Sequence, residues 1–87
     1  MFVLMFYDVG EKRVNRVLKI ARKYLTWIQN SVLEGELTPA TLEALKADVK
    51  KIIDLDHDSV LFYVWRTERY MRLDVLGVRR GNIETFI

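Results

Sequence analysis

The sequence has no cysteine, one histidine, one proline and four glycines in 87 residues. The lack of cysteine excludes a disulfide framework, a thiolate metal site and a cysteine nucleophile. It also favours an intracellular, cytoplasmic protein, because structural disulfides belong to oxidising compartments. Few chain breakers, together with 51% hydrophobic residues, exclude a disordered chain. We therefore expect an ordered protein of the cytoplasm.

Long apolar runs are also missing. The longest runs, residues 1–7 and 60–65, fall far short of the roughly 20 residues that a membrane-spanning helix needs. No basic stretch precedes the first run, as a signal peptide would require. The sequence thus predicts a soluble protein without a membrane partner. Its length predicts one domain over residues 1–87, small enough to gain stability from oligomerisation.

Several catalytic motifs are absent as well. His57 has no second imidazole or thiol with which to share a metal ion, and there is no G-x-S-x-G turn, Walker loop or dinucleotide fingerprint. The acidic stretch 54–58 lacks the later glycine and glutamate of a calcium-binding loop. It therefore predicts a solvated acidic loop.

The net charge of +2 hides an uneven distribution. Residues 11–25 carry six basic side chains and one acidic one, residues 66–80 carry five and two, and residues 26–65 carry three and seven. Two basic segments around an acidic middle would attract a polyanion such as nucleic acid. The alternative is a solvated helix face together with loop arginines.

Hydrophobic periodicity gives the order of the elements. It predicts strands at 2–7, 60–65 and 70–76, a helix from 10–11 to about Leu25, a second helix that begins at Thr38-Pro39, and a short terminal strand at 82–87. Residues 26–37 fit either a hairpin that turns at Asn30-Ser31 or one long bent strand. Tyr7, Trp27 and Tyr70 could stack on bases, but we expect strand aromatics of a small domain to lie in its core.

The first helix has two contrasting sides. Its apolar stripe is formed by Val14, Val17, Leu18, Ala21, Leu25 and Ile28. The opposite side, which we call the basic face, carries Lys12, Arg16, Lys19 and Lys23. With Arg13 and the loop arginines Arg79 and Arg80, these residues are the candidates for nucleic-acid binding.

This order of elements predicts an α+β fold, a ferredoxin-like sandwich. Its antiparallel sheet would carry two helices on one face and an extra C-terminal strand or strands. Residues 2–7 and 60–65 are apolar at odd and at even positions, so side chains on both faces of the sheet need to be shielded from water. A face-to-face homodimer would provide it, and the terminal strand could pair with the partner's sheet edge.

Asp8 is the first candidate site residue, because it ends an apolar strand at the rim of the sheet. A carboxylate there could bind a hard cation such as Mg²⁺, and a dimer would supply a second Asp8. The alternative is that Asp8 only caps the helix or turns the chain. Ser31 is read as a turn hydroxyl that could also contact a phosphate.

Several segments together resemble the small CRISPR-associated Cas2 family. They are Phe6-Tyr7-Asp8-Val9, Asn15-Arg16-Val17, residues 28–37 (IQNSVLEGEL), Asp58-Ser59-Val60 and Gly77. The resemblance implies a ferredoxin-like homodimer that acts in CRISPR spacer acquisition beside an integrase subunit. It also implies a metal-dependent endonuclease for RNA or duplex DNA, with Asp8 as metal ligand and Tyr7 and Ser31 as catalytic neighbours. Two departures are Trp27, where the family often has an arginine, and Leu33, where it often has an aromatic residue.

The leading hypothesis is therefore a dimeric Mg²⁺- or Mn²⁺-dependent endonuclease with paired Asp8 side chains. The alternative is a catalytically silent adaptor that bridges integrase subunits and binds duplex DNA through its basic residues. A third reading is a ligand-binding regulatory module, because a fold alone does not fix a function.

Overall fold

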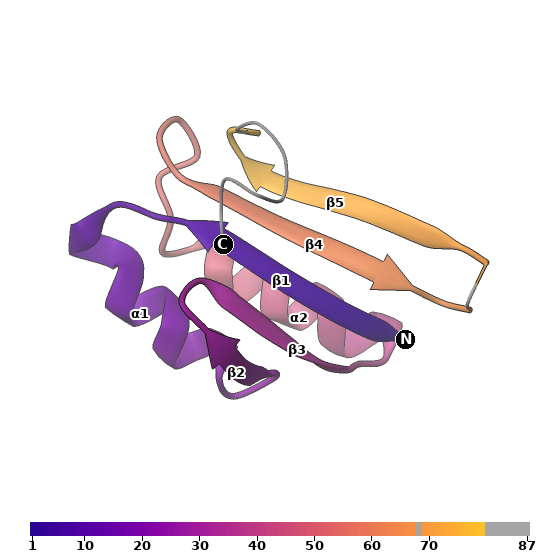
Figure 1. The fold of residues 1–87 in the computed structure, drawn as a ribbon. Helices are drawn as coiled ribbons and strands as arrows, with labels where there is room; N and C mark the ends of the chain where they lie inside the picture. Colours follow the sequence, from indigo (N-terminus) through magenta and orange to yellow (C-terminus); the bar gives the residue numbers. More distant parts are fainter. Residues whose placement is uncertain (68, 80–87) are drawn as a thin grey trace.

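The computed structural model describes residues 1–67 and 69–79. The elements, in chain order, are β1 (Phe2–Asp8), α1 (Glu11–Ala21), β2 (Thr26–Gln29), β3 (Val32–Glu36), α2 (Pro39–Lys50), β4 (Ser59–Trp65) and β5 (Met71–Gly77) (Figure 1). Neither helix is long and apolar enough to span a membrane, which holds for the described part of the chain.

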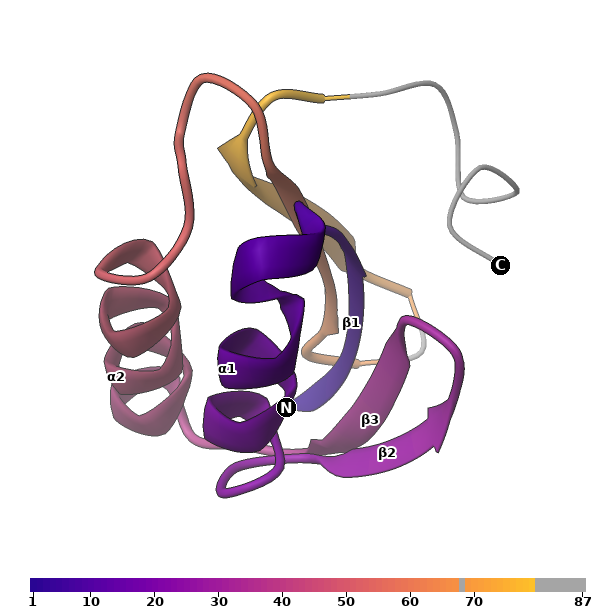
Figure 2. The same cartoon turned by 90° about the vertical axis from the view of Figure 1, so that its left-hand side faces the viewer.

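The five strands form one antiparallel sheet in the order β2-β3-β1-β4-β5. Both helices lie on the same face of this sheet (Figure 2). The predicted ferredoxin-like α+β architecture with an added strand is therefore confirmed. The open question about residues 26–37 resolves as a hairpin, because β2 and β3 pair around Asn30, whose φ of 44° is left-handed. Asparagine tolerates that conformation better than most residues.

The helix boundaries differ at one end from those predicted. α2 begins as expected, with the Thr41 amide donating to the Thr38 hydroxyl at 3.1 Å and Pro39 in the first position. α1 ends at Ala21, four residues before the predicted end at Leu25. Ile28 therefore does not extend its apolar stripe; it lies in β2 and is 45% exposed. Pairing with β3 decides the conformation of this β-branched segment.

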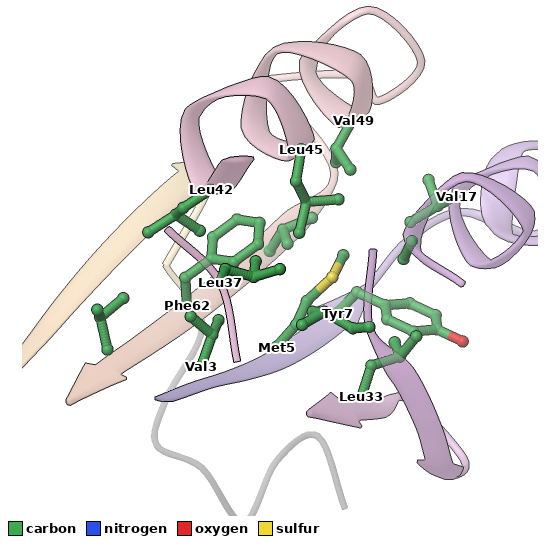
Figure 3. Packing of buried hydrophobic residues seen from close by; sticks show 14 of the residues in the cluster. Val3, Met5, Tyr7, Val17, Leu33, Leu37, Leu42, Leu45, Val49 and Phe62 are labelled. Carbon is green, nitrogen blue, oxygen red and sulfur yellow. The ribbon is translucent and has the colours of Figure 1, made fainter. Parts of the chain in front are cut away.

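The main core lies between the sheet and the helices. Alternate residues of β1, namely Val3, Met5 and Tyr7, pack there with Phe62 of β4 and Val17 of α1 (Figure 3). Leu42, Leu45 and Val49 of α2 close the same core. Two of the aromatic residues expected in the core are instead at the surface, because Trp27 is 44% and Tyr70 71% exposed.

The second face of the sheet is also apolar, as predicted. We call it the apolar sheet face; its residues are Leu4, Phe6, Val32, Leu61, Tyr63, Leu73 and Val75. The rings of Phe6 and Tyr63 meet edge to face with their centroids 5.6 Å apart. Within the described part of the chain, neither helix lies over this face (Figure 2). The homodimer remains a prediction, and the expected terminal strand 82–87 lies outside the described residues.

Candidate functional site

One end of the sheet gathers most of the candidate residues. β1 ends at Asp8 and β5 ends at Gly77, whereas β4 begins at Ser59 between them. The register pairs Asp8 with Ser59 and Ser59 with Gly77. The start of α1 follows β1 at this end (Figure 1), and Arg79 comes two residues after the end of β5. We call it the Asp8 end of the sheet.

A shallow polar hollow of about 470 Å³ opens at the Asp8 end. Its lining comes from the β1–α1 connection, the first turn of α1 and the α2–β4 loop, and consists of Asp8, Val9, Gly10, Arg13, Asp54, His57 and Asp58. The Asp8 side chain is half-buried at this rim. A small anionic or cationic group could therefore reach it from solvent.

Asp58 organises the wall of this hollow. Its buried carboxylate accepts hydrogen bonds from the amides of Gly10 (2.9 Å) and Asp54 (2.8 Å) and from Nε and Nη2 of Arg13 (2.6 and 2.8 Å). Its carbonyl accepts from the Val78 amide at 2.8 Å. The Arg13 guanidinium, helped by the two amides, holds the pKa of Asp58 well below its usual range despite burial. The prediction of a solvated acidic loop is therefore wrong for Asp58, which is a structural carboxylate.

The predicted basic residues divide into two groups. Arg13 is engaged with Asp58, which raises the pKa of its guanidinium and fixes its side chain against the protein. The residues of the basic face are all exposed: Lys12, Arg16 and Lys19 lie on α1, whereas Lys23 lies in the turn after it, because α1 ends at Ala21. Arg79 is exposed at the Asp8 end. Arg80 lies outside the described residues.

The predicted neighbours of Asp8 lie in two places. Tyr7 precedes Asp8 in β1, and Ser31 lies in the β2–β3 turn beside Tyr7. The Ser31 carbonyl accepts the Tyr7 amide at 3.1 Å, which holds the β2–β3 turn against the end of β1. The Tyr7 side chain points to the opposite sheet face from Asp8, into the core (Figure 3). Its hydroxyl donates to the Asn30 carbonyl at 3.3 Å, and burial raises its pKa. The catalytic role of Tyr7 stays a prediction, and what the structure shows is a side chain packed in the core that contacts the β2–β3 turn.

Ser59 is a candidate that the sequence did not single out. It is fully buried, and its hydroxyl has no hydrogen-bond partner among residues 1–67 and 69–79. Because directly paired residues of antiparallel strands share a face, Ser59 stands on the same side as Asp8. Its other neighbour is Gly77, which offers no side chain. The sequence signal that could have identified Ser59 was the Asp58-Ser59-Val60 segment. This segment contributes to the family resemblance, but the resemblance assigned no function to Ser59.

Comparisons with known proteins agree with the fold of this chain. A model of the family described as "CRISPR associated protein Cas2" matches residues 1–73. The chain belongs to the Cas2 family. The "CRISPR-associated endoribonuclease Cas2" of Thermotoga maritima is 57% identical over 82 residues, which cover 94% of each chain. That of Dictyoglomus turgidum is 49% identical over the full length of both. A solved Cas2 structure, 42% identical, superposes with a TM-score of 0.74 and covers 100% of this chain and 98% of its own.

The two departures from the Cas2 pattern have clear structural places. Trp27 is exposed on β2, and its Nε1 donates to the Asn30 carbonyl at 2.9 Å. Leu33 is fully buried in the main core. Trp27 therefore supports the turn and supplies no positive charge to a phosphate.

Within residues 1–67 and 69–79, the donors of this one chain are too few for a metal centre. No cluster of three or more His, Asp or Glu side chains able to hold a metal ion occurs in the described ranges. Asp58 is occupied by four donors, and Asp54 accepts from the Asp56 amide (2.9 Å) and contacts His57 Nδ1 (3.1 Å). A hard cation at Asp8 fits only if further oxygen ligands come from a second copy or from a phosphate.

Proposed function

We propose that this Cas2 chain is one subunit of a homodimeric, Mg²⁺- or Mn²⁺-dependent endonuclease that cleaves RNA. The observation that carries the proposal is the position of Asp8, at the rim of a polar hollow and on the side of the apolar sheet face. The relatives named endoribonucleases support RNA as the substrate.

The apolar sheet face supports the dimer. Burial of such a face against a second copy removes apolar area from water, at about 25 cal/mol per Å². A two-fold axis that passes through this face close to its Asp8 end would bring two Asp8 carboxylates into one site. Two carboxylates so placed repel each other, which favours a cation between them.

The chemistry follows from the groups at the Asp8 end. A bound Mg²⁺ would polarise the scissile phosphate and lower the pKa of a bound water. The Asp8 carboxylates of the two copies would hold that cation, and phosphate oxygens would be further ligands. Lys12 and Arg79, both exposed at this end, would bind the flanking phosphates and stabilise the negative charge that develops on the reacting one.

The deciding experiment compares the parent with Asp8→Asn on labelled single-stranded RNA and on duplex DNA, in Mg²⁺ and in EDTA. We expect metal-dependent cleavage of RNA by the parent, and a loss of about two orders of magnitude or more in Asp8→Asn. The matched control is Asp56→Asn, an exposed acid of the α2–β4 loop outside the hollow, which should cleave like the parent. Cleavage that persists in EDTA, or that Asp8→Asn retains, would contradict the proposal.

A second candidate function is the catalytically silent adaptor that bridges integrase subunits in spacer acquisition. The basic face favours it, because three of its exposed cations lie on α1 and the fourth, Lys23, lies in the turn directly after the helix. Binding would then release counterions and fall steeply with salt. Replacing Lys12, Arg16, Lys19 and Lys23 by Ala should lower the slope of log K against log salt by up to about 3.6 for duplex DNA. An unchanged slope would exclude the basic face as the binding surface; Lys50→Ala with Lys51→Ala is the charge control.

A further inference from the structure

The β4–β5 hairpin carries a second candidate surface, at the end of the sheet opposite Asp8 (Figure 1). A groove of about 550 Å³ lies at this hairpin and is lined by Val64, Arg66, Thr67, Tyr70, Met71 and Arg72. With seven residues in β4, it lies roughly 20 Å from the Asp8 end. We call it the hairpin groove.

The proposed dimer would leave this groove accessible. Val64 belongs to the core cluster beneath the helices and pairs with Arg72, so both stand on the helix-bearing side of the sheet. The hairpin extends beyond the ends of both helices, which therefore do not cover it (Figure 1). A partner seated on the apolar sheet face would contact the other side, on which Met71 is the one lining residue of β4 and β5.

The groove combines an exposed ring with positive charge. Tyr70 is 71% exposed, and its side chain makes no hydrogen bond or ring contact within the described residues. Arg66 lines the groove, and Arg69 precedes Tyr70 in the chain without lining it. Both are exposed and form no ion pair in the described ranges, whereas Arg72 binds Asp74 through Nε at 3.0 Å. Counting Glu68, residues 66–72 carry a net charge of +2.

We propose that the hairpin groove binds single-stranded RNA, with an unpaired base stacked on Tyr70 and flanking phosphates on Arg66 and Arg69. This inference rests on the proposed function for its choice of RNA. An aromatic ring beside a cationic groove is the arrangement that binds single strands, because every base offers a π-face and the arginines follow the backbone. An acidic peptide would use the arginines but would gain little from the exposed ring. A duplex cannot use the ring, since its bases are already stacked.

Binding of a short labelled single-stranded RNA, measured by fluorescence anisotropy in EDTA with the RNA checked for integrity, tests the ring. Stacking of one base contributes about 1–3 kcal/mol, so Tyr70→Leu should weaken binding about 5- to 150-fold. Tyr70→Phe keeps the ring and should bind within about twofold of the parent. Neither variant should alter binding of the matching duplex. Equal binding by the parent and Tyr70→Leu would overturn the proposal.

A charge pair tests the arginines. Arg66→Gln with Arg69→Gln should lower the salt slope for single strands by about 1.4, whereas Lys50→Gln with Lys51→Gln, at the exposed end of α2, should not. The assignment would be overturned if both pairs of substitutions lowered the salt slope equally. It would also be overturned if an acidic peptide bound as tightly as RNA and depended on Tyr70. A parent that cleaves no RNA but shows Tyr70-dependent binding supports the groove and refutes the nuclease. If the parent cleaves RNA and Tyr70→Leu binds RNA as tightly as the parent does, the nuclease is supported and the groove is refuted.

Discussion

Replacement of Asp58 by Asn should be the most destabilising single change at the Asp8 end. The carboxylate is 1% exposed and accepts four hydrogen bonds, two of them from Arg13. An amide keeps one oxygen acceptor but places an NH₂ group against donors. It also leaves the Arg13 charge without its partner.

The expected loss is about 3 kcal/mol of unfolding free energy. Breaking a buried ion pair costs about 3–5 kcal/mol, and the lower end applies because the Arg13 side chain is 28% exposed. Since small domains have about 5–15 kcal/mol in total, this is a large share. At roughly 4–8 °C per kcal/mol for a chain of this size, Tm should fall by about 12–24 °C.

Urea and thermal unfolding of the parent, Asp58→Asn and Asp56→Asn, all at one protein concentration, would measure the effect. A fixed concentration matters because dimerisation would add to the apparent stability. Asp56→Asn, exposed in the same loop, should change stability by less than about 0.5 kcal/mol. A loss below about 1 kcal/mol in Asp58→Asn would refute the view that this carboxylate holds the Asp8 end together.

The same carboxylate predicts a pH dependence. Because the folded pKa of Asp58 is lowered relative to its unfolded value of about 3.9, its contribution is complete well above that value. It is lost as the pH falls below about 5, through the unfolded pKa toward the folded one. The parent should therefore lose stability in acid more steeply than Asp58→Asn, which has no carboxyl to protonate. Parallel acid profiles for the two proteins would contradict this assignment.

Two further substitutions separate structure from chemistry. Ser59→Ala removes a buried hydroxyl that has no partner in the described residues, so the unfolding free energy should stay equal or rise by up to about 1 kcal/mol. If Ser59 orients the site, the same variant should cleave RNA about tenfold more slowly. Unchanged cleavage would exclude that role. Gly77→Ala should cost about 2 kcal/mol or more in urea unfolding, because φ is +78° and the new Cβ would overlap the Asp58 carbonyl. A loss below 1 kcal/mol would show that β5 can shift.

The overall architecture was predictable because its determinants are local. Thr38-Pro39 marks the start of α2. Apolar residues at both odd and even positions of β1 and β4 indicate a sheet with two apolar faces. The position of Asp8 at the end of β1 was predictable for the same reason. Its role as a metal ligand comes from the family resemblance and stays a proposal.

What the sequence missed depends on partners far along the chain. Asp58 looked like one acid in a solvated loop, yet Arg13, 45 residues earlier, buries and binds it. The early end of α1 follows from the pairing of β2 with β3, which outweighs the helical spacing of Ile28. Tyr70 looked like a core residue by type, but the hairpin that carries it extends past both helices (Figure 1). Periodicity alone reports none of these long-range relations.

The contacts of Asp58 bear on how a cleavage site could arise in so small a protein. Through side chain and backbone, this residue joins the β1–α1 connection, the α2–β4 loop and the segment after β5. The wall of the hollow is thus fixed by folding of a single chain. Dimerisation would then need to add only a second carboxylate rather than order a loop. A site preorganised in this way loses little conformational entropy when it binds a cation and a phosphate, which favours electrostatic catalysis.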